Sequence, residues 1–260
     1  MRTVSCNVCG EPREFEEVFV QKTENLRVVK CRSCGLVFVN PTFTPVEHLA
    51  WYSTRYWNDI PTDGHGNYTA IPADKVDRWT RRAKGQIDYF ATFCEAMKQK
   101  PNLHMLEVGC GYGAHLEEIR RRCPEAKLYA VEPNTRIYAS LRQRIPDLQM
   151  LGKTLETLSG VRMMFDCILI CSVLEHSFDP TTLLKRVYTL LQPTGLCLLV
   201  THNMAGRMGH VYDLNHLFCF SEGTLKQLLG NCHLQAVRVD LRDEFGHPGS
   251  DCLYVLVRKK

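Results

Sequence analysis

The sequence contains no long hydrophobic run and little excess of charge of either sign. Apolar stretches such as the one around residues 167–173 are far too short to cross a bilayer. The residues that follow Met1 contain no apolar core of the kind found in secretion signals. The net charge of +4 is small for a dedicated nucleic-acid binder, which usually concentrates far more positive charge. These absences predict a cytoplasmic protein with no membrane partner, and they disfavour a nucleic-acid partner.

The overall composition is that of an ordinary globular protein. Hydrophobic residues make up 45% of the 260 residues and charged residues 23%, which excludes extensive disorder and collagen-like structure. A chain of this length is typical of one large domain, or of one domain joined to a small module.

Cysteine is abundant, and four of the 13 cysteines are regularly spaced. Cys6 and Cys9 form one pair, Cys31 and Cys34 form a second, and each pair is followed directly by glycine. A gap of two residues lets both thiolates of a pair face one ion, and the glycine permits the tight turn that this requires. In a reducing compartment such pairs favour metal over disulfides. The sequence therefore predicts a four-thiolate Zn²⁺ site, structural because no position stays open for water or substrate.

Three regions differ in character. Residues 1–45 carry the cysteine pairs between short β-rich runs and are predicted to form a small zinc ribbon. Residues 46–100 are predicted to be a helical and aromatic connector and lid, with helical spacing from Asp74 to about Gln99. Its aromatic cluster could close over a substrate or pack between the two domains, and packing is the favoured interpretation. The cluster consists of Trp51, Tyr52, Tyr56 and Trp57.

Residues 101–260 alternate between apolar strand patterns and amphipathic helix patterns. The expected strands are 104–108, 127–131, 149–151, 165–171, 196–201, 235–241 and 252–258. The expected helices are 114–122, 135–144, 180–191 and 221–229. Alternation of this kind, with continuously apolar strands, predicts an α/β fold in which helices cover both faces of a parallel sheet.

A glycine-rich turn follows the first of these strands and opens a helix. It reads Leu106-Glu107-Val108-Gly109-Cys110-Gly111-Tyr112-Gly113. Bare backbone at the start of a helix lets a ligand approach the amide donors. The spacing also fits a relaxed dinucleotide fingerprint, and Glu132, which ends the next strand, could hold ribose hydroxyls in either case. Glu107 is poorly placed for a pyrophosphate and well placed for a ligand that carries an ammonium and a sulfonium.

Together with this turn, three further segments resemble the class I S-adenosylmethionine-dependent methyltransferases. They are 131–133 (Val-Glu-Pro), 172–180 (Ser-Val-Leu-Glu-His-Ser-Phe-Asp-Pro) and 191–196 (Leu-Gln-Pro-Thr-Gly-Leu), and the 216–221 run is similar to a segment of small-molecule members. The resemblance implies a Rossmann-like methyltransferase sheet that binds S-adenosyl-L-methionine. The amino-terminal module is similar to that of zinc-ribbon methyltransferases, some of which act on nucleotide-linked deoxysugars.

The resemblance also implies roles for individual residues. Glu107 would hold the amino end of the methionine and Glu132 the ribose, while the segment that includes Cys171 and Ser172 would border the ligand. The glycines would line the methionine and ribose portions, and they are Gly109, Gly111 and Gly113. The adenine contact is expected near Thr154 and Leu155, where the sequence has no Asp.

Three histidines lie in loops expected at the carboxyl-terminal edge of the sheet and are candidates for the base that takes a proton from the methyl acceptor. They are His176, His202 and His216. Histidine suits general-base catalysis because its ordinary pKa lies near neutrality. The pair Glu175-His176 is similar to a magnesium-binding pair in ubiquinone-pathway methyltransferases, but Ser172 stands where a further acidic ligand is expected, so a second metal is not predicted.

The leading interpretation is an enzyme that methylates oxygen or carbon of a small metabolite, including sugar-like or carrier-linked acceptors. One alternative is an RNA methyltransferase that uses the ribbon to bind RNA, and another is a non-catalytic module that binds S-adenosylmethionine. The basic residues of two helices are interpreted as solvated faces, with an anionic substrate as the alternative. These residues are Arg81, Arg82, Lys84 and the run Arg120–Arg122.

Overall fold

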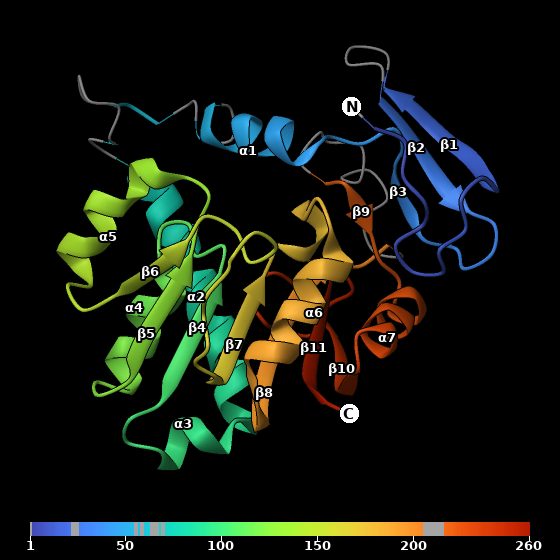
Figure 1. The fold of residues 1–260 in the computed structure, drawn as a ribbon. Coiled ribbons are helices and arrows are strands. Elements are labelled where there is room, and N and C mark those ends of the chain that lie inside the picture. The colour runs from blue at the N-terminus through green and yellow to red at the C-terminus, as the bar shows by residue number, and fades with distance from the viewer. Residues whose placement is uncertain are drawn as a thin grey trace.

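Two β-sheets of different size organise the chain (Figure 1). The computed structural model describes residues 2–21, 26–54, 57, 60–62, 68, 71–204 and 216–260. The larger sheet has seven strands and forms the α/β domain, and the smaller has four strands and contains the cysteine-rich amino-terminal segment. The predicted combination of a Rossmann-like sheet with a separate small amino-terminal sheet is confirmed.

The seven-stranded sheet has the strand order β10-β11-β8-β7-β4-β5-β6. Its strands are β4 (His104–Val108), β5 (Lys127–Val131), β6 (Gln149–Gly152), β7 (Phe165–Cys171), β8 (Leu191–His202), β10 (Leu234–Arg242) and β11 (Cys252–Lys259). The five strands from β6 to β8 are parallel, whereas β11 runs antiparallel to both β8 and β10. The expected all-parallel sheet is therefore mixed, because a short connection joins β10 to β11 as a hairpin rather than a crossover.

Helices cover both faces of this sheet, as the alternation of patterns predicted. On one face α2 (Ala73–Phe93), α4 (Ala114–Arg122) and α5 (Tyr138–Arg144) pack on strand residues such as Met105 and Leu169. On the other face α6 (Pro180–Leu190) and α7 (Glu222–Asn231) pack on the alternate residues, such as Leu106 and Ile168. Successive side chains of a strand point to opposite faces, so the continuously apolar strands supply two separate cores.

Several expected elements differ in detail from the observed ones. The long helix expected to Gln99 is interrupted at Cys94, whose extended backbone separates α2 from α3 (Glu95–Gln99). The helix expected from Thr135 begins as a short 3-10 turn, η1 (Thr135–Ile137), capped by the side chain of Asn134. A second such turn, η2 (Leu174–His176), follows β7 and has no counterpart among the expected elements.

The smaller sheet unites two distant parts of the chain. It has the order β1-β2-β3-β9, with β1 (Phe15–Gln21), β2 (Leu26–Cys31) and β3 (Val37–Val39) from the amino terminus. Its fourth strand, β9 (Phe218–Cys219), comes from the carboxyl-terminal half. The expected division into domains at residues 1–45, 46–100 and 101–260 stays a prediction. The small sheet also includes a strand from beyond residue 200.

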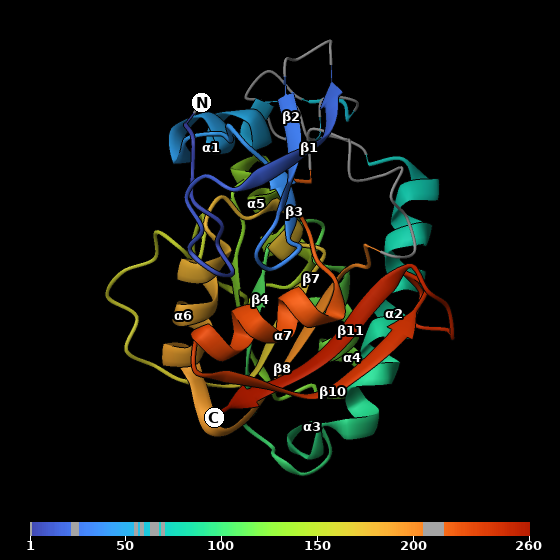
Figure 2. The ribbon, with the colours of Figure 1, turned by 90° about the vertical axis from the view of Figure 1, so that its right-hand side faces the viewer.

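The amino-terminal segments lie at one end of the larger sheet. Helix α1 (Pro45–Thr54) and the small sheet lie beyond the end toward which the arrowhead of β7 points, and both views agree on this placement (Figures 1 and 2). Ligands of open α/β folds bind at the carboxyl ends of the strands, so these segments are placed to complete a binding site. Among the described helices, none combines the length and the apolar character that crossing a bilayer requires.

The two-sided core yields a stability prediction. Leu169 in the central strand β7 is fully buried, so truncation in Leu169→Ala is expected to lower the free energy of unfolding by about 2–5 kcal/mol, measured by urea denaturation. The matched control is Val237→Ala on the edge strand β10, where the side chain is 45% exposed and the expected loss is below about 0.5 kcal/mol. Equal losses for the two variants would contradict the assignment of β7 to the core.

Candidate active site

A cavity of about 570 Å³ opens at the carboxyl end of the larger sheet. It is lined by the turn after β4, the end of β5, the segment after β7 and the end of β8, together with residues of α1 and α2. Every predicted cofactor-binding residue lies on its wall, namely Glu107, Gly109, Gly111, Gly113, Glu132, Cys171 and Ser172. The three candidate histidines, His176, His202 and His216, line the same cavity. The structure thus brings together residues that are up to 109 positions apart in the sequence (107 to 216).

Two glycines of the turn cannot be replaced by residues with side chains. Gly109 has φ of +68°, and a Cβ atom there would lie 2.6 Å from Cγ2 of Val173. Gly113 has φ of +88°, begins α4 as its N-cap, and would place a Cβ atom 2.5 Å from Leu141. Left-handed backbone and close neighbours exclude side chains at both positions. No side chain therefore fills the space beside these two glycines, while their own amides donate to the carbonyls of Val131 and Cys110.

Glu132 is held at the end of β5 by backbone amides. Its Oε2 accepts a hydrogen bond from the amide of Gly111 (2.8 Å), and its Oε1 accepts one from Asn134 (2.8 Å). Burial raises the pKa of Glu132 to about 7, although the two amides act in the opposite direction. The carboxylate is therefore fixed in place and close to its titration point at neutral pH.

Glu107 is held by a side chain that the sequence analysis did not single out. Its Oε1 lies 2.7 Å from Nδ1 of His115 in the first turn of α4, and Nε2 of His115 lies 2.7 Å from Oε1 of Gln86 in α2. Burial acts to lower the pKa of His115, but Glu107 and Cys171 together outweigh it and raise that pKa to about 10. His115 is thus a buried cation that compensates Glu107.

The remaining oxygen of Glu107 bears on the choice of ligand. Glu107 Oε2 is buried and has no hydrogen-bond partner among the described residues, although it borders the cavity. An unpartnered buried carboxylate oxygen is costly unless a donor approaches it. An ammonium group would supply that donor, whereas a pyrophosphate would repel it. The residues present therefore fit the amino end of S-adenosylmethionine better than a dinucleotide.

At the expected adenine side, the structure adds an acidic residue. Thr154 and Leu155 line the cavity as expected, and so does Glu156, whose Oε1 accepts a hydrogen bond from Ser177 Oγ (2.6 Å). Burial raises the pKa of Glu156 above its ordinary value. The sequence has no Asp at this place, and the carboxylate of Glu156, directly after Leu155, was not among the predicted site residues.

The three candidate histidines surround one buried carboxylate, Glu175. The rings of His176 and His216 stack with centroids 4.7 Å apart, and those of His202 and His216 meet edge to face at 5.0 Å. Nε2 of His202 lies 3.9 Å from Oε1 of Glu175, and Thr201 Oγ1 donates a hydrogen bond to Oε2 (2.9 Å).

Electrostatics in this cluster favour an ionised carboxylate. Burial acts to raise the pKa of Glu175, but the three neighbouring imidazoles outweigh it and place that pKa below its ordinary value. Glu175, His176 and His216 also present ligand atoms within 4.8 Å of one another, a spacing that a metal ion could use. The expectation of no second metal stays a prediction.

Helix α1 contributes a fourth imidazole, which the sequence analysis missed. His48 is 8% exposed, borders the cavity, and packs on the rings of Tyr52 (5.0 Å) and Phe178 (5.7 Å). Burial lowers the pKa of His48 to about 4, so it is neutral at physiological pH. In the sequence, only the position of His48 on a helix with other aromatic residues could have suggested that it lines the cavity.

The aromatic cluster of the connector faces the site. Tyr52 and Trp57 both line the cavity, and Tyr52 approaches the ring of His176 (6.1 Å) while Trp57 packs on Trp79 of α2 (5.0 Å). Tyr56 lies outside the described residues. Whether this cluster acts as a lid or as packing between the domains stays a prediction.

The basic helix residues are largely paired with acidic groups. Arg81 contacts Asp77 (3.0 Å) and Lys84 contacts Asp88 (3.0 Å), while the Arg120–Arg122 run pairs with Asp147, Glu118 and Asp88. Arg82 and Arg78 both lie in the cavity wall near Glu244. Nη2 of Arg78 donates to both carboxylate oxygens of Glu244. This pairing agrees with the interpretation of solvated, locally neutralised faces.

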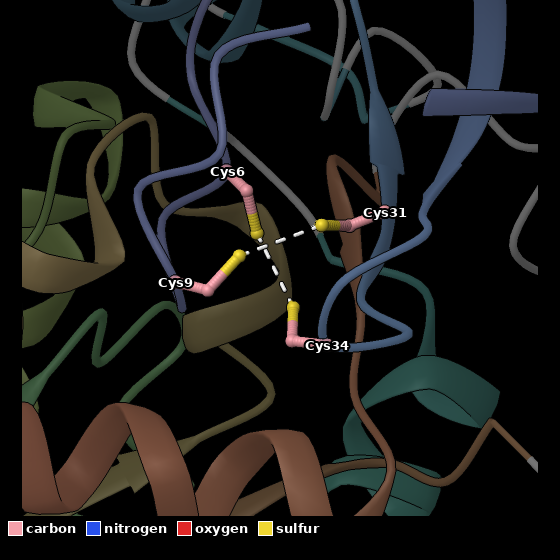
Figure 3. A group of neighbouring side chains, drawn as sticks. All are labelled: Cys6, Cys9, Cys31 and Cys34. Atoms are coloured by element: carbon pink, nitrogen blue, oxygen red, sulfur yellow. Dashed lines mark hydrogen bonds between the residues drawn. The ribbon is translucent and has the colours of Figure 1, made fainter. Parts of the chain in front are cut away.

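The four paired cysteines converge on one point (Figure 3). Their Sγ atoms lie within 4.8 Å of one another, with 3.4 Å between Cys6 and Cys34 and 3.5 Å between Cys9 and Cys31. A tetrahedral zinc with bonds of 2.3 Å requires sulfur–sulfur separations of about 3.8 Å. The cluster therefore fits a Zn²⁺ ion with four thiolates, and the predicted arrangement of the two pairs is observed.

Comparison with known proteins shows similarity to methyltransferases in the central segment. Residues 106–197, which contain the glycine turn, Glu132 and Glu175, match the methyltransferase domain family. A ubiquinone biosynthesis O-methyltransferase of Ruegeria pomeroyi is 30% identical over 151 residues, which is 54% of this chain and 58% of that protein. The chain spans about half the length of the curated relatives it matches.

Solved structures extend the similarity of fold to nearly the whole chain. A 1,6-didemethyltoxoflavin-N1-methyltransferase of Burkholderia thailandensis, with bound S-adenosylhomocysteine, aligns over 94% of this chain and 99% of its own, with a TM-score of 0.60 and 18% identity. A magnesium protoporphyrin IX methyltransferase of Synechocystis aligns over 84% of this chain and 100% of its own, with a TM-score of 0.59 and 14% identity.

The pKa of Glu132 predicts how cofactor binding depends on pH. Ribose hydroxyls would donate to the ionised carboxylate, so binding favours loss of the proton. Affinity for S-adenosylhomocysteine is expected to fall as pH drops below about 7, approaching tenfold per pH unit, and to level off above about pH 8. Isothermal calorimetry from about pH 5.5 to about pH 8.5 measures this dependence.

The control is Glu132→Gln, which cannot ionise. It should bind more weakly by about 1–3 kcal/mol at high pH and lose the Glu132 component of the pH dependence. His115 does not interfere, since its pKa of about 10 keeps it protonated throughout. An equally steep pH dependence in both proteins would remove Glu132 from the site.

The cysteine cluster predicts a metal-dependent fold of the amino-terminal segment. Cys31→Ser is expected to reduce bound zinc from about one ion per chain to near none and to loosen residues 1–45, because the metal replaces a hydrophobic core there. Elemental analysis and limited proteolysis measure the two effects. Cys123→Ser, outside the cluster, is the matched control, and retention of stoichiometric zinc by Cys31→Ser would refute the four-thiolate site.

Proposed function

We propose that the chain transfers a methyl group from S-adenosylmethionine to a hydroxyl oxygen of a small molecule. The chain has the fold of the class I S-adenosylmethionine-dependent methyltransferases, and residues 106–197 match a methyltransferase domain family. The observation that carries the acceptor chemistry is the cluster of three histidines around Glu175 on the cavity wall.

The cofactor half of the proposed site runs from Glu107 to Glu132. Glu107 Oε2 would accept from the ammonium group, the glycine turn would lie along the methionine and ribose, and Glu132 would accept from the ribose hydroxyls. Glu156 would approach the adenine edge in place of the expected Asp. Cys171 and Ser172 would border the ligand at the carboxyl end of β7.

The acceptor half is the histidine cluster. We assign the role of base to His202, because its side chain is 30% exposed at the cavity and its Nε2 lies 3.9 Å from the ionised Glu175. A carboxylate at this distance stabilises the imidazolium that forms when histidine accepts a proton. His216 lies between His176 and His202, where it would orient the acceptor, and His176 would hold the loop that carries Glu175.

The reaction follows from these positions. When bound, S-adenosylmethionine would supply a sulfonium methyl group whose carbon an acceptor oxygen can attack in line, with S-adenosylhomocysteine as the leaving group. His202 takes the proton of the acceptor hydroxyl, Glu175 stabilises the resulting charge, and His216 and His48 hold the acceptor in line. Tyr52 and Trp57 exclude water from the site. The methyl group thus moves to oxygen, and the proton resides on His202 until it leaves to solvent.

Two features favour a small acceptor over structured RNA. The basic residues that could have formed an RNA-binding surface are paired with acidic groups on α2 and α4. Histidine side chains line the acceptor half of the cavity, and the two arginines of the cavity wall, Arg78 and Arg82, contact Glu244. The matched relative from Ruegeria pomeroyi is named as an O-methyltransferase, which supports oxygen as the accepting atom.

The test is methyl transfer from labelled S-adenosylmethionine to a panel of small hydroxylated molecules. For an acceptor found in that panel, His202→Ala should lower kcat by about 10²- to 10⁴-fold with little change in affinity for S-adenosylhomocysteine. The control is His104→Ala, at the opposite end of β4. Cofactor binding without transfer to any acceptor would favour a binding module, whereas transfer to RNA with steep salt dependence would favour the RNA interpretation.

A further inference from the structure

The small sheet does more than pack on the methyltransferase domain, because its strands reach the histidine cluster. The two cysteine knuckles attach to the domain at different places. The first knuckle docks on the outer helices, where Thr181 of α6 donates to the carbonyl of Asn7 (3.2 Å) and Asn231 of α7 donates to the carbonyl of Val8 (2.6 Å). The second knuckle leads instead into β3.

The path from the second knuckle to β3 is short and hydrogen-bonded. Cys31 ends β2, and its amide donates to the carbonyl of Leu36 (2.8 Å), the residue before β3. The amide of Gly35 donates to the carbonyl of Cys31 (2.9 Å), which closes the turn that presents Cys31 and Cys34. A metal held by these cysteines therefore fixes the conformation from which β3 begins.

Strand β3 then binds the segment that carries His216. Phe38 pairs with Phe218 in register, and their rings stack with centroids 6.2 Å apart. Beyond this pairing, the amide of Val39 donates to the carbonyl of Leu217 (2.9 Å). Leu217 is 1% exposed and directly follows His216 in the chain.

Leu217 completes the connection to the buried carboxylate. Its amide donates to the backbone carbonyl of Glu175 (2.8 Å), so both backbone groups of Leu217 are used, one toward β3 and one toward η2. Leu217, which is bound by β3 of the small sheet, therefore holds His216 against His176 and His202. Within the described residues, none of these contacts involves the glycine turn or Glu132, which lie in the cofactor half.

We propose that the ribbon metal positions the acceptor half of the active site: it fixes β3, β3 holds Leu217, and Leu217 sets His216 against the Glu175 cluster. The inference rests on the proposed function for the meaning of that cluster, but its physical content does not depend on turnover. Val39 and Leu217 are positioning residues, since they act through His216. Loss of the metal should loosen the acceptor half and leave the cofactor half intact.

The test measures backbone hydrogen exchange by NMR in the zinc-bound protein, in Cys31→Ser and in the control Cys123→Ser. The amide of Leu217 is expected to exchange at least about tenfold faster in Cys31→Ser, because the strand that closes over it is released. Exchange in β4 and affinity for S-adenosylhomocysteine should change by less than about threefold. Unchanged protection of Leu217 without zinc would overturn the proposal.

A second pair of variants separates this connection from general packing. Val39→Pro removes the amide that donates to Leu217 but leaves all four cysteines in place, whereas Val39→Ala shortens the side chain and retains the amide. With zinc still bound, Val39→Pro should shift the imidazole ¹⁵N signals of His216 and speed exchange at Leu217, and Val39→Ala should do neither. Equal effects of both variants would overturn the role of the Val39 amide.

Each outcome is distinguishable from failure of the proposed function. If the protein does not bind S-adenosylhomocysteine, the methyltransferase assignment fails while the exchange result still reports on the ribbon. If the protein binds S-adenosylhomocysteine and the exchange rate of the Leu217 amide does not change on loss of zinc, the positioning role fails while the methyltransferase assignment stands.

Discussion

The buried carboxylate of Glu175 is the group on which the acceptor side of the structure depends. It is 1% exposed and sits where η2 follows the central strand β7, so its charge must be compensated inside the protein. Thr201 at the end of β8 and three imidazoles from separate segments provide that compensation. Its own backbone carbonyl accepts from Leu217 and thereby attaches the β9 segment. One charge thus assembles the ends of two strands and a distant loop into a common wall.

The two halves of the cavity are built in different ways. The cofactor half comes from one nearly continuous stretch, in which β4, the glycine turn and the end of β5 place Glu107 and Glu132 side by side. His115 and backbone amides neutralise these two carboxylates locally. The acceptor half draws on α1, η2, β8 and His216, which lies two residues before β9, with the small sheet behind it.

Much of this could be predicted from the sequence because the signals are local. The strands of 104–108 and 127–131 and the helix of 114–122 have the bounds that periodicity indicated, since apolar runs between turn signals are informative over short distances. The glycine turn and the cysteine pairs were recognisable from spacing alone. His115 and His48 carried no such signal, because each is paired with or packed on residues far away in the chain. Glu156 was not predicted, because the expected acidic residue was an Asp near Thr154 and Leu155.

By itself, the sequence determined the order of strands and helices, the bare backbone between two acidic strand ends, and the four thiols at metal-binding intervals. Each of these is written into residues a few positions apart, where backbone geometry leaves few alternatives. Only the tertiary structure decided that β9 completes the amino-terminal sheet, that three histidines meet at Glu175, and that Leu217 connects that cluster to β3. The pairings of β3 with β9 and with Leu217 span more than 170 residues, and the histidines come from segments up to 41 residues from Glu175. They form because a buried charge and a sheet edge need partners, which a local sequence pattern does not identify.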